Sequence, residues 1–153
     1  MVLQSGKAPN IDLPDKNGVE HNLKSIDASY FVIYFYPRDN TPGCTIEAID
    51  FSEDLKKYNA LKTVVIGISG GDETTKTKFC DKYNLKVLLL SDSNFAVSKA
   101  YGVYGSKKFI GRIFKGITRT TFILNKDKEI IHVFKNVKAK GHSEEVLKYL
   151  KTL

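Results

Sequence analysis

One cysteine of this chain occupies a position that favours thiol chemistry. Cys44 directly follows the segment Tyr36-Pro37-Arg38-Asp39-Asn40-Thr41-Pro42-Gly43, in which Thr41 is the expected N-cap of a helix and Pro42 its first residue. Cys44 is then the third helical residue, close to free backbone N–H groups and to the positive end of the helix dipole. Both stabilise a thiolate relative to a thiol, and the thiolate is the nucleophilic form. The spacing therefore predicts a reactive cysteine at the start of a helix.

The elements around this segment predict where the sulfur lies. The apolar run over residues 31–36 predicts a buried strand, and a helix is expected from about residue 42 to 58. Apolar side chains recur along one face of that helix, at positions 44, 48, 51, 55 and 58. We therefore expect Cys44 to face the body of the protein, in a shielded pocket beyond the carboxyl end of the strand, where open α/β sheets bind ligands.

The remaining periodicity predicts the fold class. Further strands are expected over residues 10–13, 19–22, 62–69, 87–90, 120–124 and 129–134, and further helices over 73–83, 94–101 and from about Ser143. Residues 102–116 hold four glycines and are expected to form a loop or an excursion. This order predicts a thioredoxin-like α/β sandwich with a central mixed sheet flanked by helices and an N-terminal β-hairpin extension.

Length and composition limit the alternatives. A chain of 153 residues fits one domain over residues 1–153. It has no apolar run near the roughly 18 residues of a membrane helix and no apolar signal-peptide stretch at its start, so we expect a cytoplasmic protein. Two cysteines without a Cys-x-x-Cys pair exclude a disulfide scaffold and disfavour a dithiol reductase. Together with three scattered histidines they lack zinc spacing, so no metal site is expected.

The net charge of +7 leaves open contact with nucleic acid or with a membrane surface. The densest basic group is interleaved with two phenylalanines and comprises Lys107, Lys108, Phe109, Arg112, Phe114 and Lys115. The other lysines are spread along the whole chain. Because basic charge alone says little about function, we expect a solvated surface, with no specific nucleic acid and no membrane as partners.

The pattern Pro37-x-x-x-Thr41-x-x-Cys44 resembles the active-site motif of the peroxiredoxins. The surrounding YFYPRDNTPGCTIEAIDF is similar to the subfamily called bacterioferritin comigratory protein, or peroxiredoxin Q, and the likeness covers nearly the whole chain, from about residue 7 to 150. This resemblance implies a thiol peroxidase in which Cys44 attacks the O–O bond of hydrogen peroxide or an organic hydroperoxide and becomes a sulfenic acid. It also implies no metal, haem or flavin cofactor, and thioredoxin or glutaredoxin as the reductant.

The resemblance assigns roles to three further residues. Pro37 shields the thiolate, Thr41 hydrogen-bonds the peroxide and the thiolate, and Arg119 stabilises the thiolate and the leaving oxygen as a pure donor. Backbone N–H groups of Gly43 and Cys44 are candidate further donors to that oxygen. From the residues alone, Thr41 and Pro42 would equally be an ordinary helix start, and Pro37 the end of a strand.

The sequence departs from the subfamily at the second cysteine. Many members carry a resolving cysteine five residues after the first, where this chain has Ile49; others carry it on a later helix, where Cys80 is the candidate for an intramolecular disulfide. Cys80 is offset by about 100° from Phe79, which marks the buried face with Tyr83, so we expect it at the edge of that face and partly accessible. The alternative is direct reduction of Cys44 by an external thiol.

Two other functions are alternatives to a thiol peroxidase. A cysteine hydrolase needs a histidine base near Cys44, and His21, His132 and His142 are expected at the surface or at strand and helix ends. A non-enzymatic basic binding protein on a thioredoxin-like fold is the third interpretation.

The chain lacks the long cysteine-bearing C-terminal extension of obligate-dimer peroxiredoxins, so a monomer is expected.

Overall fold

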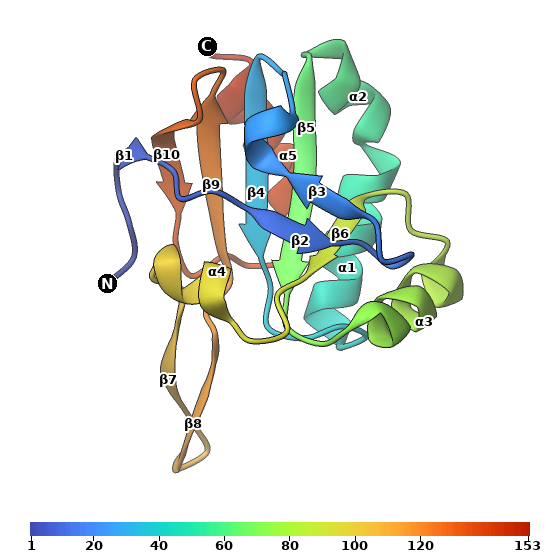
Figure 1. Cartoon of the computed structure of the whole chain (residues 1–153), viewed down its shortest axis with the longest axis vertical. Helices are drawn as coiled ribbons and strands as arrows, with labels where there is room; N and C mark the ends of the chain where they lie inside the picture. Colours follow the sequence, from blue (N-terminus) through green and yellow to red (C-terminus); the bar gives the residue numbers. More distant parts are fainter.

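A six-stranded mixed sheet forms the centre of the molecule (Figure 1). The computed structural model describes the backbone of residues 1–153 and every side chain except that of Phe109. In spatial order the strands are β1 (Gly6–Lys7), β10 (Glu129–Phe134), β9 (Thr120–Asn125), β4 (Tyr30–Phe35), β5 (Thr63–Ser69) and β6 (Leu88–Ser91). Strands β4, β5 and β6 run parallel, whereas β9, β10 and β1 complete the sheet as antiparallel neighbours. The expected mixed thioredoxin-like sheet is confirmed.

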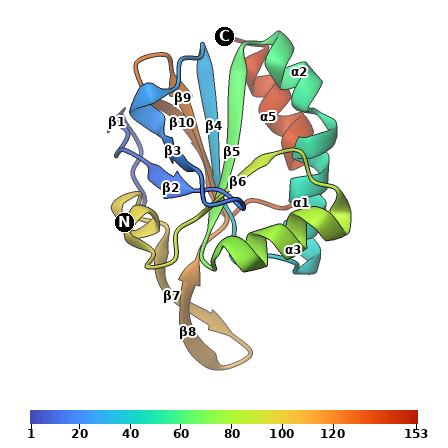
Figure 2. The same ribbon diagram turned by 45° about the vertical axis from the view of Figure 1, so that its right-hand side comes forward.

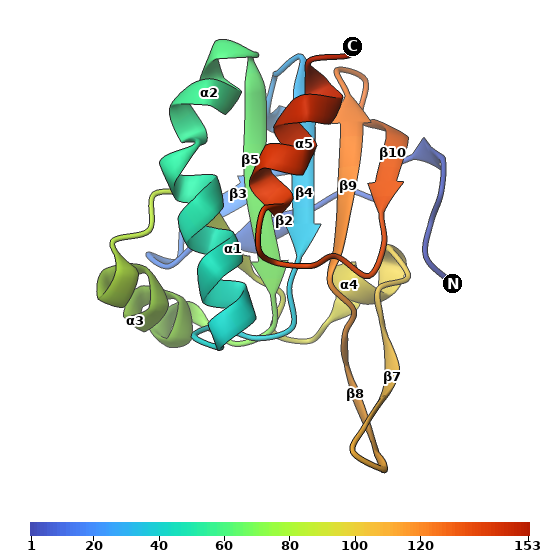
Figure 3. The same ribbon diagram turned by 180° about the vertical axis from the view of Figure 1, so that it is seen from behind.

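Both faces of the sheet are covered (Figures 2 and 3). One face carries α1 (Pro42–Glu53), α2 (Leu55–Ala60), α3 (Glu73–Tyr83) and α5 (His142–Leu150); the other carries the hairpin of β2 (Asp12–Pro14) and β3 (Glu20–Asn22), the 3-10 helix Leu23–Ser25, and α4 (Ala96–Ala100). The β2–β3 pair confirms the predicted N-terminal hairpin. None of the helices that the structure describes is both long and apolar enough to cross a membrane.

The apolar run of β4 is explained by these two layers. Every residue from Phe31 to Phe35 is 0% exposed, with Val32 and Tyr34 in one core cluster and Phe31, Ile33 and Phe35 in the other. In a strand that is buried on both faces, apolar and polar residues do not alternate, because the side chains on both sides lie in the core. Its sequence is therefore a continuous apolar run. Because β4 is an inner strand of the sheet, its carboxyl end has a fixed position in the core. The loop that leads to α1 starts at this end.

The predicted helix over residues 42–58 is wrong in one respect, because it is interrupted at Asp54. The Asp54 backbone lies at φ −91°, ψ 2°, between α1 and α2. Its carboxylate accepts a hydrogen bond of 2.8 Å from the Ser143 hydroxyl, and the Tyr58 hydroxyl donates to the Ser143 carbonyl at 2.8 Å. The start of α5 therefore holds the chain at the break and in the helical turn that follows it.

The glycine-rich segment 102–116 forms an excursion from the body of the protein, as expected. It is a regular β-hairpin and not an irregular loop. Strands β7 (Tyr104–Phe109) and β8 (Arg112–Ile117) form a hairpin that projects from the body of the molecule (Figures 1 and 3). Its two-residue turn, Ile110 and Gly111, has φ of 50° and 73°. Two positive φ values match the twist of the flanking strands, so the segment closes as a regular hairpin.

A glycine in β5 makes room for the aromatic side chain opposite it. Gly67 pairs with Tyr34, and a Cβ at position 67 would lie 2.5 Å from Tyr34 Cζ and 2.6 Å from Leu89 Cδ2. We predict that Gly67→Ala lowers the free energy of unfolding by about 1–3 kcal/mol, as overpacking does in closed cores. Urea denaturation measures it. Gly105→Ala, where nothing lies within 4 Å, is the control, and equal losses in the two variants would contradict the packing described.

Candidate active site

Helix α1 begins as the sequence predicts. Thr41 has extended backbone angles, φ −98° and ψ 155°, and Pro42 is the first helical residue. The Thr41 side chain does not cap the helix; its hydroxyl donates to the Arg38 carbonyl at 3.0 Å. The first-turn N–H groups of Gly43 and Cys44 have no carbonyl one turn earlier in the helix to bind. Cys44 therefore lies beside two donors, as expected from its position.

The thiol of Cys44 points into the protein. The residue is 1% exposed and packs in the same core cluster as Ala48, Phe51 and Tyr58, with Leu55 partly buried against it. This confirms the predicted apolar stripe and the shielded position of the sulfur at the carboxyl end of β4.

Arg119 reaches the sulfur from a distant part of the sequence. It lies between β8 and β9, and its Nη2 is 3.4 Å from Cys44 Sγ while its Nη1 is 2.7 Å from Glu47 Oε1. A Cβ at position 43 would be only 3.1 Å from Arg119 Nη2, so the absence of a side chain at Gly43 lets the guanidinium lie across the start of α1. A guanidinium only donates hydrogen bonds and carries a permanent positive charge. The structure thus brings together Cys44 and Arg119, the two residues that the family resemblance assigns to one site.

Glu47 is the site residue that sequence reasoning missed. Its side chain is 0% exposed, and no described atom hydrogen-bonds its Oε2. Burial raises the pKa of Glu47 from 4.5 to about 7, although the Arg119 guanidinium acts in the opposite direction. The available signal was its place three residues after Cys44, since residues three apart share one side of a helix.

A buried ion pair fastens the loop that precedes α1. Lys76 Nζ, fully enclosed, donates to Asp39 Oδ2 at 2.8 Å, to Ser69 Oγ at 2.9 Å and to the Gly70 carbonyl at 2.7 Å. The Tyr36 hydroxyl donates to the other Asp39 oxygen at 2.6 Å. Burial lowers the pKa of Lys76, and Asp39 raises it. These bonds join the loop ahead of Cys44 to β5 and to α3.

Cys80 is more deeply buried than predicted. It lies on α3 but is 5% exposed, so the expectation of a partly accessible position at the helix edge is wrong. The N-terminal hairpin covers that side of α3, because the Thr77 hydroxyl donates to the Lys16 carbonyl at 3.0 Å, and residues 77 and 80 share one side of the helix. Burial raises the pKa of the Cys80 thiol. The two cysteines are free thiols, each held in the core.

A sequence profile described as the AhpC/TSA family matches residues 5–133. The chain belongs to this family. It is 41% identical over 143 residues to the putative peroxiredoxin bcp of Helicobacter pylori strain J99, with 94% of each chain covered. The solved structure of PrxQ from Xylella fastidiosa superposes with a TM-score of 0.91 at 30% identity, covering 99% of this chain and 97% of that one.

A further similar solved structure, of Xanthomonas campestris bacterioferritin comigratory protein, comes from work on the alkyl peroxide reduction activity of that protein. It matches with a TM-score of 0.86 and 31% identity, over 93% of this chain and 90% of that chain. Two structures of peroxiredoxin Q from Xanthomonas campestris are single cysteine-to-serine mutants, and the two substituted cysteines are 36 positions apart. The resemblance to the bacterioferritin comigratory protein and peroxiredoxin Q subfamily is confirmed, and the chain is a peroxiredoxin.

A buried histidine that packs against Phe51 of α1 is not placed as a base for Cys44. His142 is the first residue of α5, at a helix end as expected, but it is 1% exposed and not on the surface. Its Nε2 lies 2.7 Å from Thr121 Oγ1 and its Nδ1 2.8 Å from Glu145 Oε1. Both ring nitrogens are occupied, and burial lowers the pKa of His142. A Cys-His hydrolase therefore has no support in the geometry.

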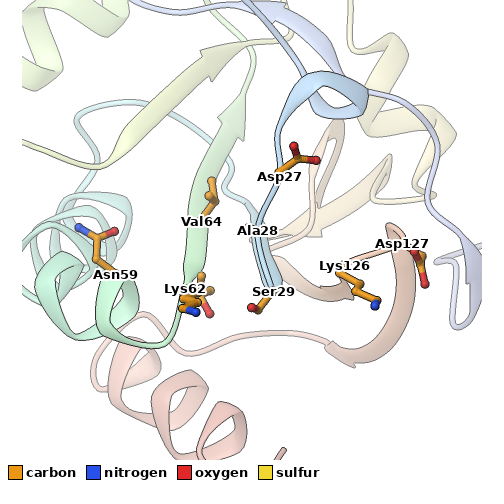
Figure 4. A pocket seen from close by; sticks show the side chains of 9 residues that line it. Asp27, Ala28, Ser29, Asn59, Lys62, Val64, Lys126 and Asp127 are labelled. Atoms are coloured by element: carbon orange, nitrogen blue, oxygen red, sulfur yellow. The ribbon is translucent and has the colours of Figure 1, made fainter.

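A broad hollow at the opposite ends of the strands does not belong to the site. It encloses about 710 Å³ at the amino-terminal ends of β4 and β5, between Ser29, Lys62 and Lys126 (Figure 4). A smaller hollow of about 460 Å³ borders Pro37 and Asp39 at the carboxyl ends of the strands. Only the smaller one adjoins the loop that leads to Cys44, as the position of ligands in α/β folds requires.

The raised pKa of Glu47 makes a prediction about pH. A carboxyl that binds its proton more tightly in the folded state stabilises the fold fully below about pH 4.5, and this contribution is lost as the pH rises through about 7. Glu47→Gln has no such proton to lose. We predict that the stability of Glu47→Gln relative to wild type increases between pH 4.5 and 8, by on the order of 3 kcal/mol.

Urea denaturation of both proteins across this pH range measures the difference. Glu144→Gln, which removes a carboxylate that is 75% exposed, serves as the matched control and should track wild type. Parallel pH profiles for wild type and Glu47→Gln would show that Glu47 is not strained by burial.

Proposed function

We propose that the chain acts as a single domain over residues 1–153 and is a thiol peroxidase whose attacking atom is Cys44 Sγ. The observation that carries this proposal is the 3.4 Å contact between that sulfur and the Arg119 guanidinium at the start of α1. A cationic donor beside a sulfur stabilises the negative charge that a nucleophilic thiolate carries. In this proposal the Cys44 sulfur itself performs the redox chemistry, passing from thiolate to sulfenic acid.

The first step is a displacement on oxygen. The Cys44 thiolate attacks the terminal oxygen of hydrogen peroxide or an organic hydroperoxide; the S–O bond forms as the O–O bond breaks. The leaving oxygen takes a proton and departs as water or an alcohol, and Cys44 becomes a sulfenic acid. Arg119 and the N–H groups of Gly43 and Cys44 are donors positioned where charge develops on the leaving oxygen.

Thr41 and Pro37 complete the pocket in this proposal. The single hydroxyl proton of Thr41 is donated to the Arg38 carbonyl, so its oxygen is left as an acceptor for the O–H of the peroxide. Pro37 has no N–H to offer and, half-buried at the end of β4, shields the sulfur from water. A peroxide held between acceptor and donors is aligned for attack.

We assign the resolving role to Cys80. Its thiol attacks the Cys44 sulfenic acid, which forms the disulfide and releases water. Cys44 and Cys80 are 36 positions apart, the same separation as the two cysteines substituted in the Xanthomonas campestris structures. Both thiols are buried in the reduced protein, and the proposal includes opening of the last turn of α3, which carries Cys80, as the disulfide forms. The alternative is direct reduction of Cys44 by an external thiol.

The remaining assignments follow from this chemistry. An intramolecular disulfide is complete within one chain, which supports a monomer. A dithiol protein such as thioredoxin or glutaredoxin is suited to reduce it by thiol–disulfide exchange. Free cysteines without a disulfide scaffold suit a reducing compartment, which supports the cytoplasm.

The test of the first step is a stopped-flow measurement of hydrogen peroxide reduction. We predict that Cys44→Ser abolishes turnover with any thiol. Arg119→Met should lower the second-order rate constant for peroxide by about 10²–10³-fold, the usual effect of removing one charge-stabilising donor. Arg119→Met leaves the buried Glu47 carboxyl unpaired and can therefore destabilise the fold. The double variant Arg119→Met/Glu47→Gln removes that carboxylate, so its loss of activity can be assigned to catalysis and not to unfolding. Wild-type rates in a folded double variant would refute the role of Arg119.

The resolving step makes a separate prediction. Cys80→Ser should lose its Cys44 thiol to peroxide at the wild-type rate, yet turn over with thioredoxin about tenfold or more slowly, since no intramolecular disulfide can form. Hydrogen exchange of wild type after peroxide treatment should quicken at the amides of Asn84 and Leu85, which bind the Cys80 carbonyl in the reduced protein. If Cys80 remains alkylatable while Cys44 is oxidised, the assignment fails and direct reduction replaces it.

A further inference from the structure

The β7–β8 hairpin, residues 104–117, exposes apolar side chains far from any core. Ile110 is 84% exposed, Ile113 75% and Phe114 46%, whereas the apolar side chains of the sheet are nearly all buried. Figures 1 and 2 show the hairpin extending beyond the body of the protein with neither face covered. We call these residues the basic arm. Its apolar end is unexplained by folding, because it packs against no core cluster.

The turn of the basic arm carries a residue that its backbone disfavours. Ile110 occupies the first position of the turn with φ 50°. A left-handed conformation is strained for a β-branched residue, and asparagine, aspartate or glycine is the usual occupant of such a turn. A strained and exposed isoleucine lowers both stability and solubility, so its presence points to a contact that the apolar tip makes.

The charge of the basic arm indicates the sign of its partner. Residues 104–117 contain four basic side chains and no acidic one: Lys107, Lys108, Arg112 and Lys115. Lys108 pairs across the strands with Ile113, and Lys107 with Phe114. Each face of the arm therefore carries a basic residue beside an apolar one. A second copy of this chain would present the same positive charge and be repelled, so the partner is anionic.

The shape of the basic arm favours a bilayer over a protein or a nucleic acid. A two-stranded arm with apolar groups at its tip and on both faces is surrounded evenly by a fluid interface, whereas a protein groove covers one side. A nucleic acid would use the basic side chains but not Ile110 or Ile113. Apolar side chains that enter the headgroup region, together with lysines that contact anionic lipid, are the two components of peripheral membrane binding.

The basic arm is rooted at the proposed active site. Strand β8 ends at Ile117, two residues before Arg119, and Lys107 Nζ donates to the Ile117 carbonyl at 2.8 Å. Burial lowers the pKa of Lys107, Arg119 lowers it further and Cys44 raises it, so this lysine lies within electrostatic reach of the site. A surface that holds the tip therefore faces the end of the molecule where Cys44 lies.

We propose that the basic arm docks this peroxiredoxin on anionic phospholipid bilayers, with Ile110, Ile113 and Phe114 entering the interface, and so presents membrane hydroperoxides to Cys44. The proposed docking is argued only from the residues of the basic arm. The proposed substrate, a membrane hydroperoxide, rests in addition on the proposed function as a peroxidase. It revises the expectation from sequence that no membrane is a partner.

Vesicle sedimentation of the full chain tests the docking. Wild type should bind vesicles of mixed phosphatidylcholine and phosphatidylglycerol, bind vesicles of phosphatidylcholine alone weakly, and lose binding as salt increases. Lys108→Glu/Lys115→Glu should weaken binding about tenfold or more. The control Lys56→Glu/Lys126→Glu changes the net charge equally, at exposed positions away from the arm. Equal losses in both pairs would mean attraction by net charge only and would overturn the proposal.

The Ile110→Asn variant tests insertion without endangering the fold. Asparagine suits the left-handed turn, so this variant should be at least as stable as wild type yet bind vesicles about five- to tenfold more weakly. Unchanged binding would indicate that charge alone holds the arm at the vesicle surface and would refute insertion of the apolar tip. Loss of thioredoxin-dependent turnover in Ile110→Asn without any vesicle binding by wild type would assign the arm to a protein and also refute it.

A single introduced tryptophan reports the depth of the arm. The chain contains no tryptophan, so Ile113→Trp has one emitter, and its emission should shift to the blue on anionic vesicles. Ile131→Trp, at a residue of β10 that is 37% exposed, should not shift. Phospholipid hydroperoxide in these vesicles should be reduced more slowly by Ile110→Asn than by wild type, with hydrogen peroxide reduced equally. If the wild-type protein does not reduce hydrogen peroxide, the proposed peroxidase function is refuted, whereas the proposed docking is not.

Discussion

The guanidinium of Arg119 is the group on which the site depends. It lies between the Cys44 sulfur and the Glu47 carboxyl, which α1 presents on neighbouring turns. A buried carboxylate that loses its partner is strongly destabilising, so the arginine cannot leave without cost to the fold. Glu47 thus keeps Arg119 oriented, and Gly43 leaves the space in which it lies. Burial favours the neutral form of Glu47 by raising its pKa, and the Arg119 guanidinium partly counteracts this effect.

Much of the architecture could be predicted because its causes are local. The doubly buried β4, the helix start at Pro42 and the full extent of α3 follow from apolar periodicity and capping residues. The break at Asp54 could not be predicted, since the hydrogen bonds from Ser143 and Tyr58 depend on where α5 packs. The hairpin at 104–117 was obscured by glycines, which indicate loops in a sequence whether or not the backbone pairs.

The same distinction separates the site residues. Cys44 and its neighbours are contiguous, so their spacing alone suggested a reactive thiol, and the family motif added Arg119. Glu47 and Lys76 resembled solvated charges on helices, because nothing in a sequence shows that a charged side chain is enclosed. The depth of Cys80 was underestimated for a related reason: the covering turn near Lys16 lies more than sixty positions away along the chain.

The bonds of Lys76 have a mechanical consequence for a protein whose two thiols lie on different helices. They tie the segment that leads into α1 to the first half of α3, upstream of Cys80. If only the end of α3 melts to expose Cys80, this ammonium clamp stays closed and serves as a fixed hinge. In the proposed cycle, the melted turn would rewind against this fixed segment after the disulfide is reduced, so the reduced site would re-form with the same geometry.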